Sequence, residues 1–427
     1  LSQLFGLELS VKLIALAVPP MTVAGFLWVA REVHHRLPPT VAFALPFAFS
    51  HPFLFGFLNF TLSMSLAFLA FGLWLRLGRL GRTKVRAILF VPISFIVFIT
   101  HAYGWGTLGL LAFSAEAVRQ HDKGMAWWGA GIRAAMHAVV MAGPVLMMLA
   151  WRSTVQQGGT ADWFNWFAKL NWILMALRDR WQWFDVACVA VAVGVLAIAI
   201  VNRRLTYSRN LAFSALVLLA FFVILPRIIF GSAYADMRLA PFMIATALLA
   251  IRFRAETHMQ TARVLAVLGV GFYLVKVAAT TLSLTIAAND QAAKLAALGQ
   301  VPLGAKLVTL SGQECGNLWN MPRNSHLGAM AIVRRHAFSN DQWAIEGANL
   351  LSVHYRQAGR FIADPSEIVK PRRCAHREHW TPDRSLAAIP RDAFDYLWLV
   401  DVPAYDPKSV AGMQLIWRGP GSLLYAI

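Results

Sequence analysis

Long apolar runs fill most of residues 9 to 287 and constrain the fold of this chain more than any other feature. A helix needs about 20 residues to cross a bilayer, and lipid offers no partner for free backbone groups, so spanning segments must be helical. Ten runs are predicted to be transmembrane helices: Leu9–Ala30, Pro38–Ser50, Phe53–Leu75, Arg86–His101, Tyr103–Val118, Ala130–Trp151, Phe184–Val201, Asn210–Ile229, Leu239–Ile251 and Ala262–Ala287. Three are short, which indicates tilted, broken or protein-shielded segments.

The composition supports a membrane protein with a water-soluble tail. Hydrophobic residues make up 58% of the chain and charged residues 14%, against about 25% charged in soluble domains, which excludes a soluble enzyme. Residues 288–427 read as ordinary globular sequence, with strand-like runs at 306–310, 396–402, 413–417 and 423–426 and a helical pattern near 326–337. We therefore expect an α-helical polytopic membrane domain of about ten spans, residues 1–287, followed by a small α/β or α+β domain.

Basic residues predict the orientation. Alternate loops at 31–36, 76–86, 119–133, 203–209 and 252–263 hold sixteen Lys and Arg residues, and the other loops hold six. Short basic loops stay in the cytoplasm, so both ends of the chain are expected outside, in the inner (plasma) membrane of a bacterium. The net charge of +18 lies in short clusters between apolar runs, not on one polar face, which argues against nucleic acid as a partner.

With this orientation, three external turns face one space and predict a polar cleft. They carry His51, then His101 and Tyr103, then Arg227, Asp236 and Arg238. Ionisable groups near membrane depth usually face protein or a water-filled cavity. Structural roles remain open for each: a turn residue for His51, an interfacial aromatic turn for His101 and Tyr103, helix capping or an ion pair for Asp236 and Arg238, and snorkelling for Arg227.

Two further features lie on the same side. Lys276, inside the last span, either snorkels, meets a phosphate or pairs with Asp236. Loop 152–185 is rich in Trp mixed with Arg and Lys, which predicts an interfacial anchor, with contact to a lipid-linked substrate as the alternative. No short ligand spacing occurs, so no metal site is assigned, although a divalent metal remains open as a cofactor. The scattered His residues of the tail are expected on its solvated surface.

Two of the three cysteines, Cys315 and Cys374, lie in the tail, whereas Cys188 lies in a predicted span. An external tail would sit in an oxidising compartment. We therefore expect a disulfide between Cys315 and Cys374, closing a loop of about 60 residues and contributing roughly 4 kcal/mol in the chain-entropy model.

Three stretches of the membrane part carry a family resemblance: FSHPFLFGFLNFTLSMSLAFLAFGLWL, THAYGWGTLGLL and YADMRLAPF. Together with the external C-terminal domain, they resemble the bacterial C-type integral-membrane glycosyltransferases over most of the chain. The resemblance implies transfer of a sugar from a polyprenyl-phosphate carrier to an acceptor on the external face. The partners it implies are membrane lipid and the lipid-linked sugar donor.

The resemblance also implies residue roles. Arg227, Arg238 and Lys276, with Tyr103, would contact the substrate and its phosphate, and Asp236, His51 and His101 would form the catalytic or metal side. The family's acidic residue in the first external loop has no clear counterpart, because Glu8 is the only acid before Leu9; the chain reads as an entry partway through a longer protein. The alternatives are a transporter or flippase of a lipid-linked or anionic substrate, and a non-catalytic protein of envelope assembly.

Overall fold

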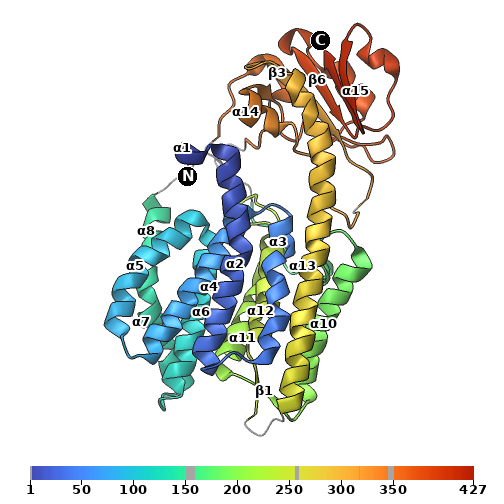
Figure 1. Ribbon diagram of the computed structural model, residues 1–427. Helices are drawn as coiled ribbons and strands as arrows, with labels where there is room; N and C mark the ends of the chain where they lie inside the picture. The colour runs from blue at the N-terminus through green and yellow to red at the C-terminus, as the bar shows by residue number, and fades with distance from the viewer. Residues whose placement is uncertain (1, 151–158, 255–258, 317, 345–350) are drawn as a thin grey trace. The chain divides into compact units, whose positions relative to one another are not determined.

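The computed structural model describes residues 2–150, 159–254, 259–316, 318–344 and 351–427. The chain divides into two compact units (Figure 1). The described residues of unit 1 are 2–150, 159–254 and 259–280, and those of unit 2 are 281–316, 318–344 and 351–427. The division falls within helix α13, close to the boundary at residue 287 expected from the sequence. Each unit is described separately below.

Unit 1 is built from helices joined by short connections, apart from one two-stranded sheet, β1 with β2. The elements are α1 (Ser2–Phe5), α2 (Leu7–His34), η1 (Pro39–Phe49), α3 (His51–Leu54), α4 (Leu58–Arg79), α5 (Thr83–Thr100), α6 (Ala102–His121), α7 (Trp127–Ala138), η2 (Val139–Met141), α8 (Gly143–Ala150), α9 (Trp166–Leu174), α10 (Gln182–Val201), β1 (Leu205–Tyr207), α11 (Arg209–Ile224), α12 (Ala235–Leu249), β2 (Ile251–Phe253) and α13 (Met259–Leu295).

Several of these helices have the length and composition of membrane spans. Among the described residues, α2, α4, α5, α10 and α13 are long and apolar enough to cross a bilayer, and α7 with α8 would make a sixth span. Each of the ten predicted segments overlaps a helix of unit 1. The finding supports a polytopic membrane protein.

Several predicted segments differ from continuous α-helices. Phe53–Leu75 is interrupted between α3, which ends at Leu54, and α4, which begins at Leu58, and Asn210–Ile229 extends beyond α11, which ends at Ile224. Pro38–Ser50 forms the 3-10 helix η1, which has Pro at its start and Pro46 inside it; a Pro in a helix interior removes a backbone hydrogen bond and clashes with the preceding turn. Ala130–Trp151 is broken between α7 and α8 with a bend of 58°, beside Gly143 and Pro144, and Trp151 lies outside the described residues.

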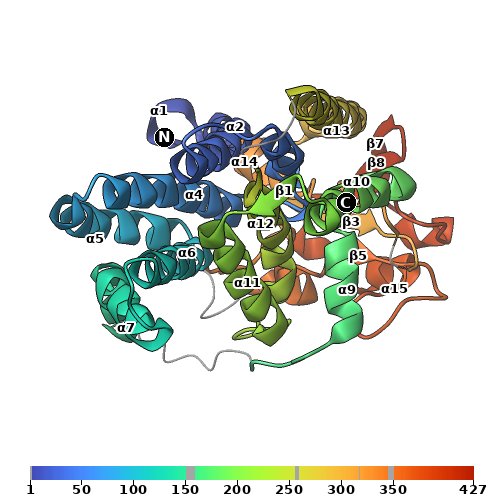
Figure 2. The ribbon, with the colours of Figure 1, turned by 90° about the horizontal axis from the view of Figure 1, so that it is seen from below.

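Helix α12 forms the centre of unit 1. All of its residues except Arg238 and Ala247 are buried, and it packs against α9, α10, α11 and η1. Figure 2 looks along the helices and shows α11 and α12 between α5 and α7 on one side and α10 and α13 on the other. Residues at the start of α12 are therefore surrounded by several other helices.

The connections with basic residues meet at one end of unit 1, which we call the basic end. Glu32 at the end of α2 pairs with Arg79 at the end of α4, and Arg209 at the start of α11 pairs with Asp122 after α6. The segments after α10 and α12 pair as β1 and β2. The opposite end, which we define by residues 50–57, 100–103 and 225–238, carries the turns singled out in the sequence.

Unit 2 contains a six-stranded mixed sheet with the order β4-β3-β6-β8-β7, in which β5 also pairs with β3. Its elements after α13 are η3 (Ala296–Gln300), β3 (Lys306–Gly312), α14 (Ala329–Arg335), β4 (Phe338–Ser339), η4 (Arg356–Ile362), β5 (Ile368–Val369), α15 (Pro382–Ala388), η5 (Arg391–Ala393), β6 (Tyr396–Val400), η6 (Pro407–Val410), β7 (Gln414–Gly419) and β8 (Ser422–Ala426). The four strand-like runs of the sequence correspond to β3, β6, β7 and β8.

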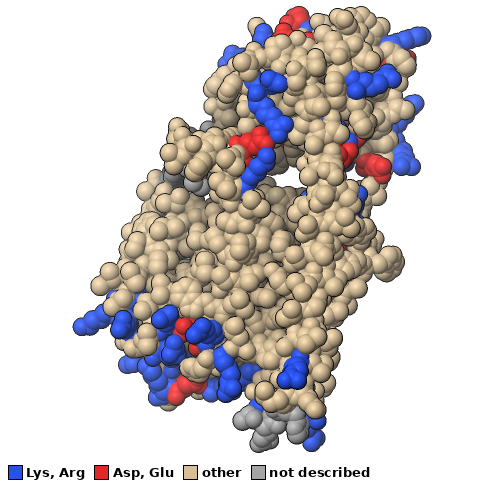
Figure 3. All heavy atoms as spheres, in the orientation of Figure 1, with Lys and Arg blue, Asp and Glu red and all other residues tan. Residues whose placement is uncertain are grey.

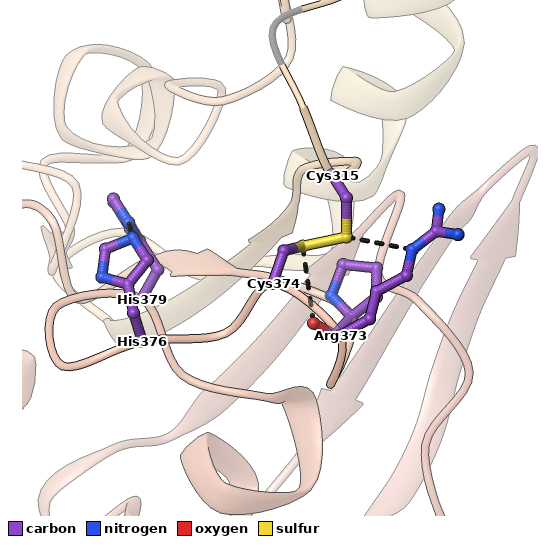
Figure 4. Close-up of a disulfide and its surroundings, with 6 residues drawn as sticks. Cys315, Arg373, Cys374, His376 and His379 are labelled. Carbon is purple, nitrogen blue, oxygen red and sulfur yellow. Dashed lines mark hydrogen bonds between the residues drawn. A yellow bond between two sulfur atoms is a disulfide. The ribbon is translucent and has the colours of Figure 1, made fainter.

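A disulfide joins Cys315 and Cys374 across 59 positions of unit 2 (Figure 4). It connects the segment after β3 with the segment after β5, two neighbouring parallel strands. Cys188, in α10, is a buried free thiol.

Candidate functional site

His101 and Tyr103 join α6 to α12 at the opposite end of unit 1. His101 caps α6, and its Nδ1 accepts a hydrogen bond from the Tyr103 backbone N–H at 3.1 Å. The Tyr103 hydroxyl donates to the Ala235 carbonyl at 2.8 Å. Gly104 lets α6 approach α4, because a Cβ there would lie 2.3 Å from the Ser63 Oγ, whereas Gly106 has open space around it.

Arg238 projects from the first turn of α12 onto aromatic rings. Its guanidinium carbon lies 4.3 Å from the ring centre of Phe57 and 5.9 Å from that of Phe60. Phe60 in turn packs edge-on against His101 and Tyr103. Within the described residues, Arg238 makes one hydrogen bond, to the Ala233 carbonyl at 3.4 Å, and no ion pair, and its buried Nε has no acceptor. Within this part of the chain, Arg238 is a half-buried cation without a neighbouring anion.

Asp236 has a different environment from Arg238, although only two residues separate them. Its carboxylate is buried and lies 3.3 Å from the Nζ of Lys169 in α9. That ammonium also donates to the carbonyls of Phe222 and Leu225 at the end of α11. Asp236 and Lys169 therefore hold α9, α11 and α12 together, and neither the pairing of Asp236 with Lys276 nor a pair with Arg238 occurs.

Arg227 and His51 lie in the same contact network. Arg227 pairs with Asp162 at 3.3 Å and lies 5.6 Å from the ring centre of Tyr234. Tyr234 packs edge-on against Phe55, and Phe55 against the buried His51. The structure thus brings His51, His101, Tyr103, Arg227, Asp236 and Arg238 to one end of unit 1.

Lys276 does not join this contact network; it pairs with Asp185. Its Nζ lies 2.8 Å from the Asp185 carboxylate of α10 and donates to the Leu177 carbonyl at 2.9 Å. Both charged side chains are buried, so this pair fixes α13 against α10. The pairing with Asp236 considered from the sequence is wrong, because Lys169 pairs with Asp236 instead. The sequence places Lys169 in the external loop 152–185, which was expected to lie in the membrane interface.

The Trp-rich loop presents several aromatic rings to the exterior. Trp163, Trp166 and Trp183 are exposed, whereas Trp172 packs edge-on against Tyr234. Arg152 and the start of this loop lie outside the described residues. Exposed Trp side chains suit the headgroup region of a bilayer.

A cavity of 370 Å³ lies at the basic end and was not predicted from the sequence. Its charged lining includes Arg86 and Glu116, whose side chains are only 2% and 1% exposed and lie 3.0 Å apart. Arg119 also bonds Glu116, and Arg86 stacks on Trp74 at 3.9 Å. All three carboxylates of this lining, Glu32, Glu116 and Asp122, are bonded to arginines, which makes the basic end an ion-pair network.

Neither group of described residues that could hold a metal ion includes His51, His101 or Asp236. Both groups lie in unit 2: His326 with Asp341 and Glu367, and His376 with Glu378 and His379. His326 is exposed, as expected for the tail histidines, but its Nδ1 bonds the buried Asp341 carboxylate at 2.9 Å. These residues are separated by 15 and 26 positions in the sequence, so no short spacing could reveal them.

No model of a known protein family, no curated protein and no solved structure matches this chain.

Proposed function

We propose that unit 1 lies in the bacterial inner (plasma) membrane, with the basic end in the cytoplasm and both the opposite end and residues 281–427 outside. Five apolar helices of spanning length support this proposal. In Figure 3, Lys and Arg gather at the lower end of unit 1, and an almost uncharged band lies above them. Basic loops favour the cytoplasmic side. The proposal includes about ten crossings, some of them by short or broken helices.

Labelling of single cysteines tests this orientation. Ser232→Cys lies at the opposite end and Leu80→Cys at the basic end, and both positions are exposed. In intact cells whose outer membrane is permeable to the reagent, a membrane-impermeant maleimide should label Ser232→Cys and should label Leu80→Cys only after lysis. A reporter enzyme fused after Ala287 should be active only in the periplasm. Labelling of both cysteines from outside would contradict the proposal.

We further propose that the opposite end binds a polyprenyl-phosphate-linked sugar and that the protein transfers this sugar to an acceptor. Arg238 carries the proposal, because a half-buried guanidinium that has no carboxylate partner among the described residues suits an anionic group of a ligand. Arginine binds phosphate through paired N–H donors. Arg227 supplies a second cation, and the exposed Trp side chains suit contact with lipid.

The chemistry follows from charge. Breaking the bond between sugar and phosphate leaves negative charge on the phosphate, and a guanidinium placed there stabilises the transition state. The acceptor hydroxyl would form the new bond to the sugar and lose its proton to a base. His101 packs edge-on against Phe60, whose ring centre lies 5.9 Å from the Arg238 guanidinium, so it is the nearer candidate for that base. Asp236 is buried against Lys169, so in this proposal it positions the start of α12 and does not contact the acceptor.

The test is binding of a polyprenyl phosphate to the purified protein in detergent, followed by native mass spectrometry. Arg238→Gln should weaken binding by about 10- to 100-fold, the equivalent of one charge-assisted hydrogen bond. Arg79→Gln at the basic end is the matched control, because Arg79 is already paired with Glu32, and it should bind normally. Equal binding by Arg238→Gln and the unmodified protein would reject the proposal.

A further inference from the structure

We propose that unit 2 binds a divalent cation between His326, Asp341, Asp364 and Glu367. From the His326 Nδ1, the nearest carboxylate oxygens of Asp341, Glu367 and Asp364 lie at 2.9, 3.7 and 4.0 Å. Ligand atoms about 2.0–2.6 Å from a shared ion lie about 3–4 Å from one another. The ligand atoms of His326, Asp341 and Glu367 all lie within 4.8 Å of one another, and the Asp364 carboxylate lies beside them, within 4.0 Å of the His326 Nδ1.

The sheet explains why these residues meet. β6 occupies one edge of β3, and both β4 and β5 pair with the other edge, β4 near Lys306 and β5 near Gly312. Between them, the Asn340 side chain takes the place of a neighbouring strand by bonding the backbone N–H and carbonyl of Thr309. Asp341 directly follows Asn340, and Glu367 directly precedes β5, so the two carboxylates come together where the edge is interrupted.

The buried carboxyl group of Glu367 is the feature that points to a bound ligand. Its side chain is 0% exposed, and neither carboxylate oxygen has a hydrogen-bond partner among the described residues. The carboxyl groups of Asp364 and Asp341 are its neighbours. A buried carboxyl group without partners is unfavourable, and a bound cation would supply both the missing charge and the missing contacts.

The protein supplies little positive charge of its own at this position. Among the described residues, the only side chain within ion-pair distance of Asp341, Asp364 and Glu367 is His326. Carboxylate oxygens suit Mg²⁺, Ca²⁺ and Mn²⁺, whereas imidazole suits transition metals. The mixed donor set favours a cation of the Mn²⁺ type, and its binding would connect the loop before α14 to the segments around β4 and β5.

The same unit offers a matched control. His376, Glu378 and His379 also lie close enough to share an ion, but this group is on the surface, and the two imidazoles already bond each other at 3.0 Å. Figure 4 shows His376 and His379 beside each other on a loop near the disulfide. Glu378→Gln therefore removes an exposed carboxylate from a competing group and leaves the proposed site intact.

The experiment counts Mn²⁺ bound by the full chain in detergent after treatment with EDTA, from the electron paramagnetic resonance signal of free Mn²⁺. The unmodified protein and Glu378→Gln should each bind one ion. Glu367→Gln should weaken binding by at least about 10-fold, since loss of an outer-shell partner alone costs 10- to 100-fold. Competition with Zn²⁺, Ca²⁺ and Mg²⁺ then ranks the cations.

Hydrogen exchange of peptides around β4 and β5 provides the second measurement. Mn²⁺ should slow exchange there in the unmodified protein and in Glu378→Gln but not in Glu367→Gln. If Glu367→Gln fails to fold, His326→Ala replaces it, because the His326 side chain is mostly exposed. Absence of Mn²⁺ binding to the unmodified protein at millimolar concentration, or equal binding by the folded Glu367 or His326 variant, would overturn the proposal.

Discussion

The two ends of unit 1 use arginine in different ways. At the basic end, Arg79, Arg86 and Arg119 are bonded to Glu32 or Glu116, and the cavity between them is lined by these paired groups. At the opposite end, Arg227 pairs with Asp162, but Arg238 lies on the rings of Phe57 and Phe60 and has no carboxylate partner among the described residues. The difference indicates that paired arginines stabilise the helix bundle, and it is the basis of the proposal that Arg238 binds a ligand.

The largest expected effect is at the basic end. Glu116→Gln leaves Arg86 buried without its carboxylate, and removing one partner of a buried ion pair costs about 3–5 kcal/mol. Thermal unfolding in one detergent should show this loss. Asp162→Asn at the opposite end is the control: its pair with Arg227 is about one-third exposed, so solvent screening limits the loss to about 1 kcal/mol or less. Equal losses would contradict the comparison.

A smaller loss of stability is expected for Asp236→Asn at the opposite end. Lys169 would lose one charged partner but keep the carbonyls of Phe222 and Leu225. Because a hydrogen bond to a charged group contributes about 1.5–3 kcal/mol, the decrease should lie in that range. A loss as large as that of Glu116→Gln would mean that the opposite end depends on charge pairing to the same degree as the basic end.

Ligand binding by a conservative variant of Arg238 tests the difference between the two ends in a second way. Arg238→Lys retains the charge but loses the planar, forked arrangement of donors that lies over Phe57 and Phe60. We expect it to bind a polyprenyl phosphate about 10-fold more weakly, between the unmodified protein and Arg238→Gln. Titration with the phosphate measures this order. Full binding by Arg238→Lys would show that charge alone is sufficient.

The sequence predicts the helical segments well because a bilayer requires long apolar runs, and each of the ten runs overlaps a helix. It also places His101, Tyr103 and Asp236 on connections that the structure brings together. It does not predict which charged side chains pair. Lys169, from the loop expected at the membrane interface, pairs with Asp236, and Lys276 pairs with Asp185. Such pairs depend on how helices distant in the sequence pack together, and a local sequence pattern does not predict that packing.

The group of residues that we propose to bind a cation was not predicted from the sequence, for a related reason. His326, Asp341, Asp364 and Glu367 are brought together by two short strands on one edge of β3, and neither strand is longer than two residues. A strand that short gives no alternating pattern to recognise. Metal motifs whose ligands are close in the sequence place them on one local element. In unit 2, the pairing of β4 and β5 with β3 brings the proposed ligands together.

The smallest predicted effect concerns Tyr103, which tests whether the opposite end is rigid before a ligand binds. Tyr103→Phe removes the hydrogen bond to the Ala235 carbonyl but keeps the ring that packs on Phe60, so stability should fall by only about 1 kcal/mol. Because this bond joins α6 to the first turn of α12, which carries Arg238, phosphate binding should weaken by a factor of a few. Thermal unfolding and titration measure the two effects. If stability falls and binding is unchanged, the position of Arg238 depends on its aromatic neighbours and not on the link between α6 and α12.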